Sequence, residues 1–259
     1  MRRSRRKAMR AAGAVLLACL IGMAVFFVWA WRASRRVPDF YVAALMAPRE
    51  ELAQSGQEFV QELQQLQSDV HREGTWQAVF TEKEINGWLA VELPARHPDL
   101  LPQQLKDPRV EIGADRARLA ARYESGKFRS VLYVSVAVAT RDGDNVVAVT
   151  LLEARAGALP VPLRSVTRHI DRAAERLKIE IQWEEDDQGR PVAVFTVPLP
   201  ASTQRFDVRI DKIVLQSEQV IVYGRTRRVD SFLDWLKESR QSDASSEEDV
   251  SSGDEESTR

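Results

Sequence analysis

The stretch FTEKEINGWLAVEL, residues 80–93, places Glu82 and Glu84 on either side of Lys83. Two carboxylates can serve as a general acid and a general base when their surroundings separate their pKa values. The same residues also fit the start of a helix, because Thr81 and Glu84 have the spacing of a capping box and acidic residues are favourable in a first helical turn. No nucleophile or histidine stands nearby in the sequence. We therefore predict a helix that begins after Thr81, and no catalytic residue.

Metal and sulfur chemistry has few candidates. The histidines are His71, His97 and His169, and the single cysteine, Cys19, lies in an apolar stretch. One cysteine excludes an intrachain disulfide and a cysteine-based zinc site, and the histidines are too far apart for a local metal motif. The motifs of nucleotide-binding loops, zinc proteases, serine hydrolases and EF-hands are absent from the sequence. We predict no metal, no cofactor and no enzymatic activity.

A row of arginines recurs at every fourth position in PLRSVTRHIDRAAERL, residues 162–177; its members are Arg164, Arg168, Arg172 and Arg176. On a helix with 3.6 residues per turn, each step of four rotates by about 40°, so the row winds through about 120°. One interpretation is that the arginines contact anionic lipid headgroups. The alternative is a solvated helical face that Asp171 and Glu175 neutralise.

Helices and short strands must position these residues. Apolar residues at helical spacing predict helices over 48–73, after Thr81 and over 162–177, and a short helix around 231–240. Alternating patterns predict strands, and the short turns SGK and RDGD make the first three antiparallel. The predicted strands cover residues 110–123, 128–141, 145–157, 178–183, 192–200, 207–216 and 219–225. Strands with inserted helices indicate the α+β class.

The strands at 128–141 and 145–157 are apolar on both faces. A strand with one face in water would be polar on that side, so protein or ligand must cover each face. We predict an apolar ligand groove, with Tyr133, Ser135 and Thr150 as its few polar groups. Its lining would be Leu132, Val134, Val136, Val138, Val147, Val149 and Leu151. The alternative is an ordinary core closed by the helices at 48–73 and 162–177.

Residues 11–31, AAGAVLLACLIGMAVFFVWAW, contain no charged side chain. As a helix they would extend about 31 Å, which matches the roughly 30 Å hydrocarbon core of a bilayer. The run is longer than the apolar core of a cleaved signal peptide, which is the alternative. Residues 1–10 carry more arginine and lysine than the segment after the span, which predicts a cytoplasmic N-terminus. We therefore predict a single-pass plasma-membrane protein whose main domain is extracytoplasmic.

The composition divides the chain into five parts. We expect a basic cytoplasmic segment (1–10), a transmembrane helix (11–31), a linker (32–47), an extracytoplasmic α+β domain (48–238) and a disordered acidic tail (239–259). Nucleic acid is not an expected partner, because the middle of the chain has no net basic charge and lies outside the cytoplasm. The expected partners are the bilayer through residues 11–31, a lipid ligand and an envelope protein.

The order of these features resembles the YpmS-like family of membrane-anchored bacterial proteins. The resemblance covers roughly residues 10–225, and it is carried by T-x-x-E-I-N at Thr81, Glu84, Ile85 and Asn86 and by G-x-L-P-V-P at 157–162. The family has no established activity. The resemblance implies a fold similar to exported lipid-handling proteins, in which a strongly curved sheet wraps a long helix and leaves an apolar groove.

The sequence thus predicts an α+β protein in which an N-terminal transmembrane helix precedes a curved antiparallel sheet packed with amphipathic helices. The expected function is to bind a lipid or other apolar ligand in a groove between sheet and helix. The alternative is a ligand-free interaction or scaffold module of a cell-envelope complex. The two differ in whether the second sheet face encloses a cavity or is filled by the domain's own side chains.

Overall fold

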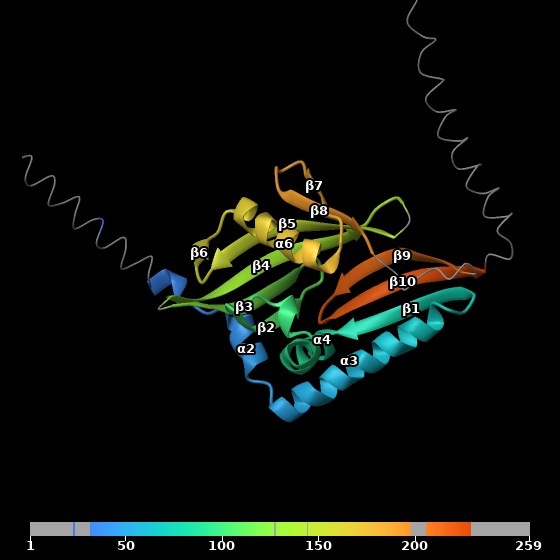
Figure 1. The fold of residues 1–259 in the computed structure, drawn as a ribbon, viewed down its shortest axis with the longest axis horizontal. Helices are drawn as coiled ribbons and strands as arrows, with labels where there is room; N and C mark the ends of the chain where they lie inside the picture. Colours follow the sequence, from blue (N-terminus) through green and yellow to red (C-terminus); the bar gives the residue numbers. More distant parts are fainter. Residues whose placement is uncertain (1–22, 24–31, 127, 144, 198–205, 229–259) are drawn as a thin grey trace, which may run out of the picture.

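Two antiparallel sheets and several helices make up the part of the chain that the computed structural model describes, residues 23, 32–126, 128–143, 145–197 and 206–228 (Figure 1). The predicted α+β class is confirmed. The predicted segments 1–10 and 11–31, a short helix near 231–240 and the acidic tail fall outside these residues. None of the helices within the described residues is long and apolar enough to cross a membrane.

The larger sheet has seven strands, in the order β2-β3-β4-β5-β8-β7 with β6 beside β5. The hairpins that join β3 to β4 and β4 to β5 turn where the sequence predicted. The strands are β2 (Leu105–Ile112), β3 (Ala117–Ser125), β4 (Phe128–Thr140), β5 (Val146–Ala156), β6 (Leu159–Pro160), β7 (Gln182–Glu185) and β8 (Pro191–Thr196).

The prediction of one strand over 110–123 is wrong, because β2 and β3 form a hairpin there. The turn occupies residues 113–116, and the Gly113 N–H donates to the Arg116 carbonyl at 2.8 Å. Glycine and aspartate within Gly-Ala-Asp-Arg are turn residues, and they interrupt the alternating pattern between two strands that each continue it.

The smaller sheet pairs a strand from the first part of the described chain with the two strands that end it. Its order is β1-β10-β9, with β1 (Gly74–Thr81), β9 (Phe206–Gln216) and β10 (Gln219–Arg228). The Trp76 ring lies against Gly224, where a Cβ atom would stand 2.2 Å from the ring. Its Nε1 donates to Thr226 Oγ1 at 3.2 Å, and Thr226 Oγ1 donates to the Val70 carbonyl at 3.1 Å. These buried contacts hold β10 against β1 and the end of the preceding helix.

The long helix α3 lies beside the smaller sheet and packs against β1, α4 and η1 (Figure 1). Helix α6 lies over β5 and β8 of the larger sheet. The helices are α2 (Asp39–Leu45), α3 (Arg49–Asp69), α4 (Glu82–Gly87), the π-helix η1 (Trp88–Glu92), α5 (Leu93–Arg96), the 3₁₀ helix η2 (Pro98–Leu100) and α6 (Leu163–Leu177).

Residues 32–47, expected as a linker, are instead docked on the larger sheet. Tyr41 of α2 is 1% exposed and packs with Ala120 and Val131, while Phe40 meets Tyr133 edge to face at 6.0 Å between ring centroids. The Tyr41 hydroxyl donates to the Asp107 carbonyl at 2.8 Å. Two adjacent aromatic side chains thus anchor this seven-residue helix over one end of the sheet.

Candidate functional site

The predicted capping box at the start of α4 is confirmed. The Glu84 N–H donates to Thr81 Oγ1 at 3.2 Å, and the Thr81 N–H donates to the Glu84 carboxylate at 2.7 Å. Both donors would otherwise lack a partner at the first helical turn. These two residues of the opening motif therefore have a structural role in starting the helix.

Glu82 and Asn86 of the same motif bind the outer edge of β2. Glu82 Oε2 accepts from the Ile112 N–H, while the Asn86 carboxamide accepts from the Val110 N–H and donates to the Val110 carbonyl, each at 2.8 Å. The Glu218 N–H, in the turn between β9 and β10, donates to the Ile112 carbonyl at 2.8 Å. An edge strand presents unpaired backbone groups, and here side chains and a turn satisfy them.

Burial alters the acidity of Glu82. Loss of solvent raises the pKa of its carboxyl group, and the hydrogen bond from Ile112 acts in the opposite direction but is smaller. A perturbed carboxyl can mark an active site, yet the observed contact of this one is structural, because it accepts a hydrogen bond from β2.

The seven predicted groove residues are only partly brought together. Val136 and Leu151 face each other across β4 and β5 and are buried with Val110, Ile112 and Ala117. Val134 and Val149 pack against this cluster and stay half-buried. The remaining three lie outside the cluster: Leu132 and Val138 are half-buried, and Val147 is buried.

The prediction that Tyr133, Ser135 and Thr150 serve the groove is wrong. Successive residues of a strand point to opposite faces, so these three project away from the face that carries Val136 and Leu151. Ser135 is 1% exposed, and its Oγ has no hydrogen-bond partner within the described residues. Burial raises the pKa of the Tyr133 hydroxyl, and its ring is held against Phe40.

Two separate helical elements flank the aliphatic face of the larger sheet. Side chains of α6 pack on it from one side, those of α4 and η1 from the other, and β9 and β10 contribute at the end. All of these covering side chains are half-buried: Ile85, Leu89, Leu163, Val166, Ile170, Leu215 and Val220. In the alternative of an ordinary core, both long helices would cover this face; α6 does so, whereas α3 packs against α4, η1 and β1.

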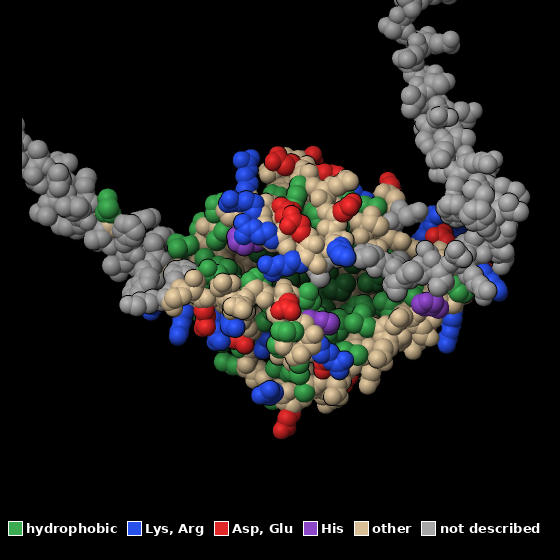
Figure 2. Space-filling model, viewed as in Figure 1, with side chains coloured by type: hydrophobic (Ala, Val, Ile, Leu, Met, Phe, Trp, Pro, Cys, Tyr) green, Lys and Arg blue, Asp and Glu red, His purple; other side chains and the backbone are tan. Residues whose placement is uncertain are grey.

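The cover over this face is incomplete. Figure 2 shows the molecule hollowed here, with hydrophobic side chains at the bottom of the hollow. Leu119 of β3 stands between Val110 and Val134 in the strand register, yet it is 48% exposed. We use the term apolar groove for Leu119 together with partly exposed aliphatic side chains that pack around Val136 and Leu151, namely Ile85, Leu89, Val134, Val149, Val166 and Ile170.

The arginine row lies on the outer side of α6, where all four side chains are exposed. Within the described ranges, Arg164, Arg168, Arg172 and Arg176 form no ion pair. Asp171, which was considered as a neutralising partner, instead accepts from Trp183 Nε1 at 2.6 Å and ties α6 to β7. The helix thus presents apolar residues to the sheet and positive charge to its surroundings.

Within the described part of the chain, no three His, Cys, Asp or Glu side chains are grouped to hold a metal ion. The sequence showed Asn86 only as part of a motif, and its hydrogen bonds to β2 were not predicted.

Comparisons with family models, curated proteins and solved structures found no match to this chain. The resemblance to the YpmS-like family therefore stays a prediction.

Proposed function

We propose that this protein is a single-pass membrane protein whose extracytoplasmic α+β domain binds a lipid or another apolar ligand in the apolar groove. The observation that carries the proposal is the incomplete cover of the larger sheet between α6 and the α4–η1 segment. A core that serves only stability would be expected to bury a strand residue such as Leu119, which is 48% exposed.

The energetics favour an occupant. Exposed apolar surface costs about 25 cal/mol per Å², and contiguous apolar patches invite association. Small-molecule sites are usually concave and lined mainly by apolar side chains. The side chains packed on the Val136 and Leu151 cluster are aliphatic except for Trp183, and a hydrocarbon chain matches such a surface.

The proposed membrane location rests on the charge-free segment 11–31 and on the excess of basic residues before it. The chain after this segment supports a domain held close to the bilayer, because Ala33 and Ser34 are already buried. The exposed arginines of α6 would then meet anionic headgroups, a surface contact that strengthens with each basic side chain.

A second candidate function is an interaction module without a ligand. Three apolar side chains outside the groove favour it, because Leu45, Met46 and Leu63 are 39%, 76% and 41% exposed. They lie on or next to α2 and α3, where a partner protein of the cell envelope could dock.

A competition assay with a fluorescent fatty acid tests the proposal on a fragment of residues 32–240. Val134→Trp would fill the groove, so we expect it to weaken binding about tenfold or more. Ala139→Trp is the matched control, because Ala139 is exposed on the opposite face of the same strand. Denaturant melts confirm that each variant folds. Absence of binding by the unmodified fragment would favour the interaction module.

A further inference from the structure

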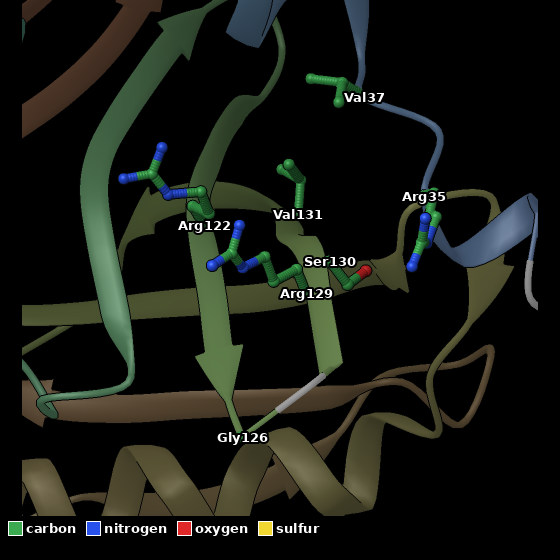
Figure 3. A pocket seen from close by; sticks show the side chains of 7 residues that line it. All are labelled: Arg35, Val37, Arg122, Gly126, Arg129, Ser130 and Val131. Atoms are coloured by element: carbon green, nitrogen blue, oxygen red, sulfur yellow. The ribbon is translucent and has the colours of Figure 1, made fainter.

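A second concave surface lies on the face of the larger sheet opposite the apolar groove. Its volume is about 530 Å³, within the usual range for ligand sites. Three arginines line it, Arg35, Arg122 and Arg129, together with Val37 and Val131. Figure 3 shows Arg122 and Arg129 projecting from the two strands of the β3–β4 hairpin, with Arg35 across the pocket. We refer to it as the basic pocket.

The strand register fixes one wall of the basic pocket. Arg122 of β3 is directly opposite Val131 of β4, and Arg129 precedes Val131 by two residues, so all three project from the same sheet face. This face is the one that α2 covers farther along the sheet.

The other wall is the chain segment that follows the predicted membrane span. The Ser130 hydroxyl donates to the Ser34 carbonyl at 2.7 Å, and the Ala158 N–H donates to the Ala33 carbonyl at 2.8 Å. Gly157 allows this close approach, because a Cβ atom there would lie 2.5 Å from the Ser34 oxygen. The backbone that carries Arg35 is therefore held against the sheet.

Two carboxylates, Asp107 and Glu124, form ion pairs with arginines of the pocket. Arg122 pairs with Asp107 at 2.7 Å and with Glu124 at 3.3 Å, and Arg129 approaches Glu124 at 3.8 Å. All of these side chains are substantially exposed, and such ion pairs contribute little free energy. A phosphate group can displace them, because guanidinium groups bind its oxygens with strong charge-assisted hydrogen bonds.

We infer that the basic pocket binds the phosphate group of an anionic phospholipid. The assignment to a lipid rests on the proposed function, since it requires residues 11–31 to lie in the membrane. Residue 31 would end the span only four positions before Arg35, which places the pocket at the headgroup level. Val37 and Val131 add an apolar surface that would suit the glycerol end of a lipid and would gain nothing from inorganic phosphate.

The test uses full-length protein in a non-ionic detergent, titrated with short-chain phosphatidylglycerol, with phosphatidylcholine of equal chain length, and with inorganic phosphate. We expect phosphatidylglycerol to bind about tenfold tighter than phosphatidylcholine, whose choline group the arginines repel. The variant Arg122→Gln/Arg129→Gln should lose about tenfold in affinity for phosphatidylglycerol. Arg225→Gln is the matched control, because Arg225 forms a comparable exposed pair with Asp211 on the smaller sheet.

Equal affinity for phosphatidylglycerol in the unmodified protein and the double variant would overturn the inference. Displacement of the lipid by equimolar inorganic phosphate would overturn the assignment to a lipid. If the double variant does not fold, Arg129→Gln replaces it, since its side chain is 76% exposed and its ion pair is long. Repeating the titration with Val134→Trp separates this pocket from the groove, because that change should leave the arginine-dependent affinity intact.

Discussion

Two asparagines complete the edges of the two sheets. Asn86 binds both backbone groups of Val110 in β2. Asn145 accepts from the Ile210 N–H at 2.7 Å and donates to the Val208 carbonyl at 2.9 Å in β9. A carboxamide carries a donor and an acceptor side by side, as a peptide group does, so each asparagine takes the place of a neighbouring strand.

Replacing Asn86 by aspartate should destabilise the fold. Aspartate cannot donate to the Val110 carbonyl, and its negative charge would face that carbonyl inside the protein. We expect the free energy of unfolding to fall by about 1–3 kcal/mol or more, measured by urea denaturation. Gln67→Glu makes the same amide-to-acid change on the exposed side of α3 and should stay within about 0.5 kcal/mol. Equal midpoints for Asn86→Asp and unmodified protein would refute the role at the β2 edge.

Glu82 gives a pH-dependent prediction. Its raised pKa means that the folded state holds the proton more tightly than the unfolded state does. Its contribution to stability is therefore present below the ordinary glutamate value and is lost as pH rises through the folded pKa. Glu82→Gln keeps an acceptor for Ile112 without the buried charge, so its stability relative to unmodified protein should increase from about pH 4 to pH 7.

Urea melts of the two proteins at both pH values measure this difference. Glu82→Ala is the control, because it leaves the Ile112 N–H without its partner and should be less stable than Glu82→Gln throughout. If the difference in free energy of unfolding between Glu82→Gln and unmodified protein is the same at both pH values, desolvation of the carboxylate does not control the contribution of Glu82 to stability.

At the scale of elements, a glycine contact sets the position of α3. A Cβ atom on Gly87 of α4 would lie 2.4 Å from the Gly56 nitrogen and 2.5 Å from the Leu52 carbonyl oxygen of α3. Phe59 extends the contact to Phe80 and Trp88, with ring centroids 5.3 and 5.8 Å apart. The two backbones approach this closely only where side chains are absent.

Gly87→Ala should therefore push α3 away from α4. Alanine normally favours a helix over glycine by about 1 kcal/mol, so a loss of stability would be opposite in sign to the intrinsic preference. We expect a net loss of about 1–3 kcal/mol in thermal or urea unfolding. Gly113→Ala is the control, because its new Cβ would meet one backbone oxygen at 3.3 Å. A stabilised Gly87→Ala variant would contradict the close contact.

The sequence predicted those elements whose signals lie within a few residues. The capping-box spacing of Thr81 and Glu84 predicted the start of α4. Helical spacing predicted the apolar side of α6, which carries Leu163, Val166 and Ile170. Strand β1 was missed although its buried residues Trp76, Ala78 and Phe80 alternate, because the run is short and its partner, β10, comes much later in the chain. Asn86 and Asn145 bond to residues 24 and 63 positions away, so their local context gave no sign of the sheet edges that they cover.

The candidate groove was only partly predicted, because its aliphatic strand residues have a local pattern whereas the helices that cover them are set by long-range contacts. Alternating aliphatic residues in β4 showed that both faces need cover, but not which helix supplies it. The choice of α6 over α3 depends on the contact between Gly56 and Gly87, which directs α3 toward α4 and β1. Leu119 was missed because its neighbours on the same face of β3 are alanines, Ala117 and Ala121, which do not form a row of large aliphatics.

For the whole molecule, the structure separates two surfaces of different chemistry on the two faces of the larger sheet. One face carries the apolar groove between α6 and the α4–η1 segment. The other carries α2, the docked segment after residue 31 and the basic pocket. A domain tethered at residue 31 would thus have a phosphate-binding surface near its attachment and a hydrocarbon-binding surface on the opposite face.

Native mass spectrometry tests most directly whether the groove holds an apolar ligand. Residues 32–240 are purified without detergent, and bound molecules are identified by organic extraction. We predict about one lipid or other apolar molecule per domain, lost in Val134→Trp and retained in Ala139→Trp. A stable, ligand-free monomer of unmodified sequence would contradict the claim.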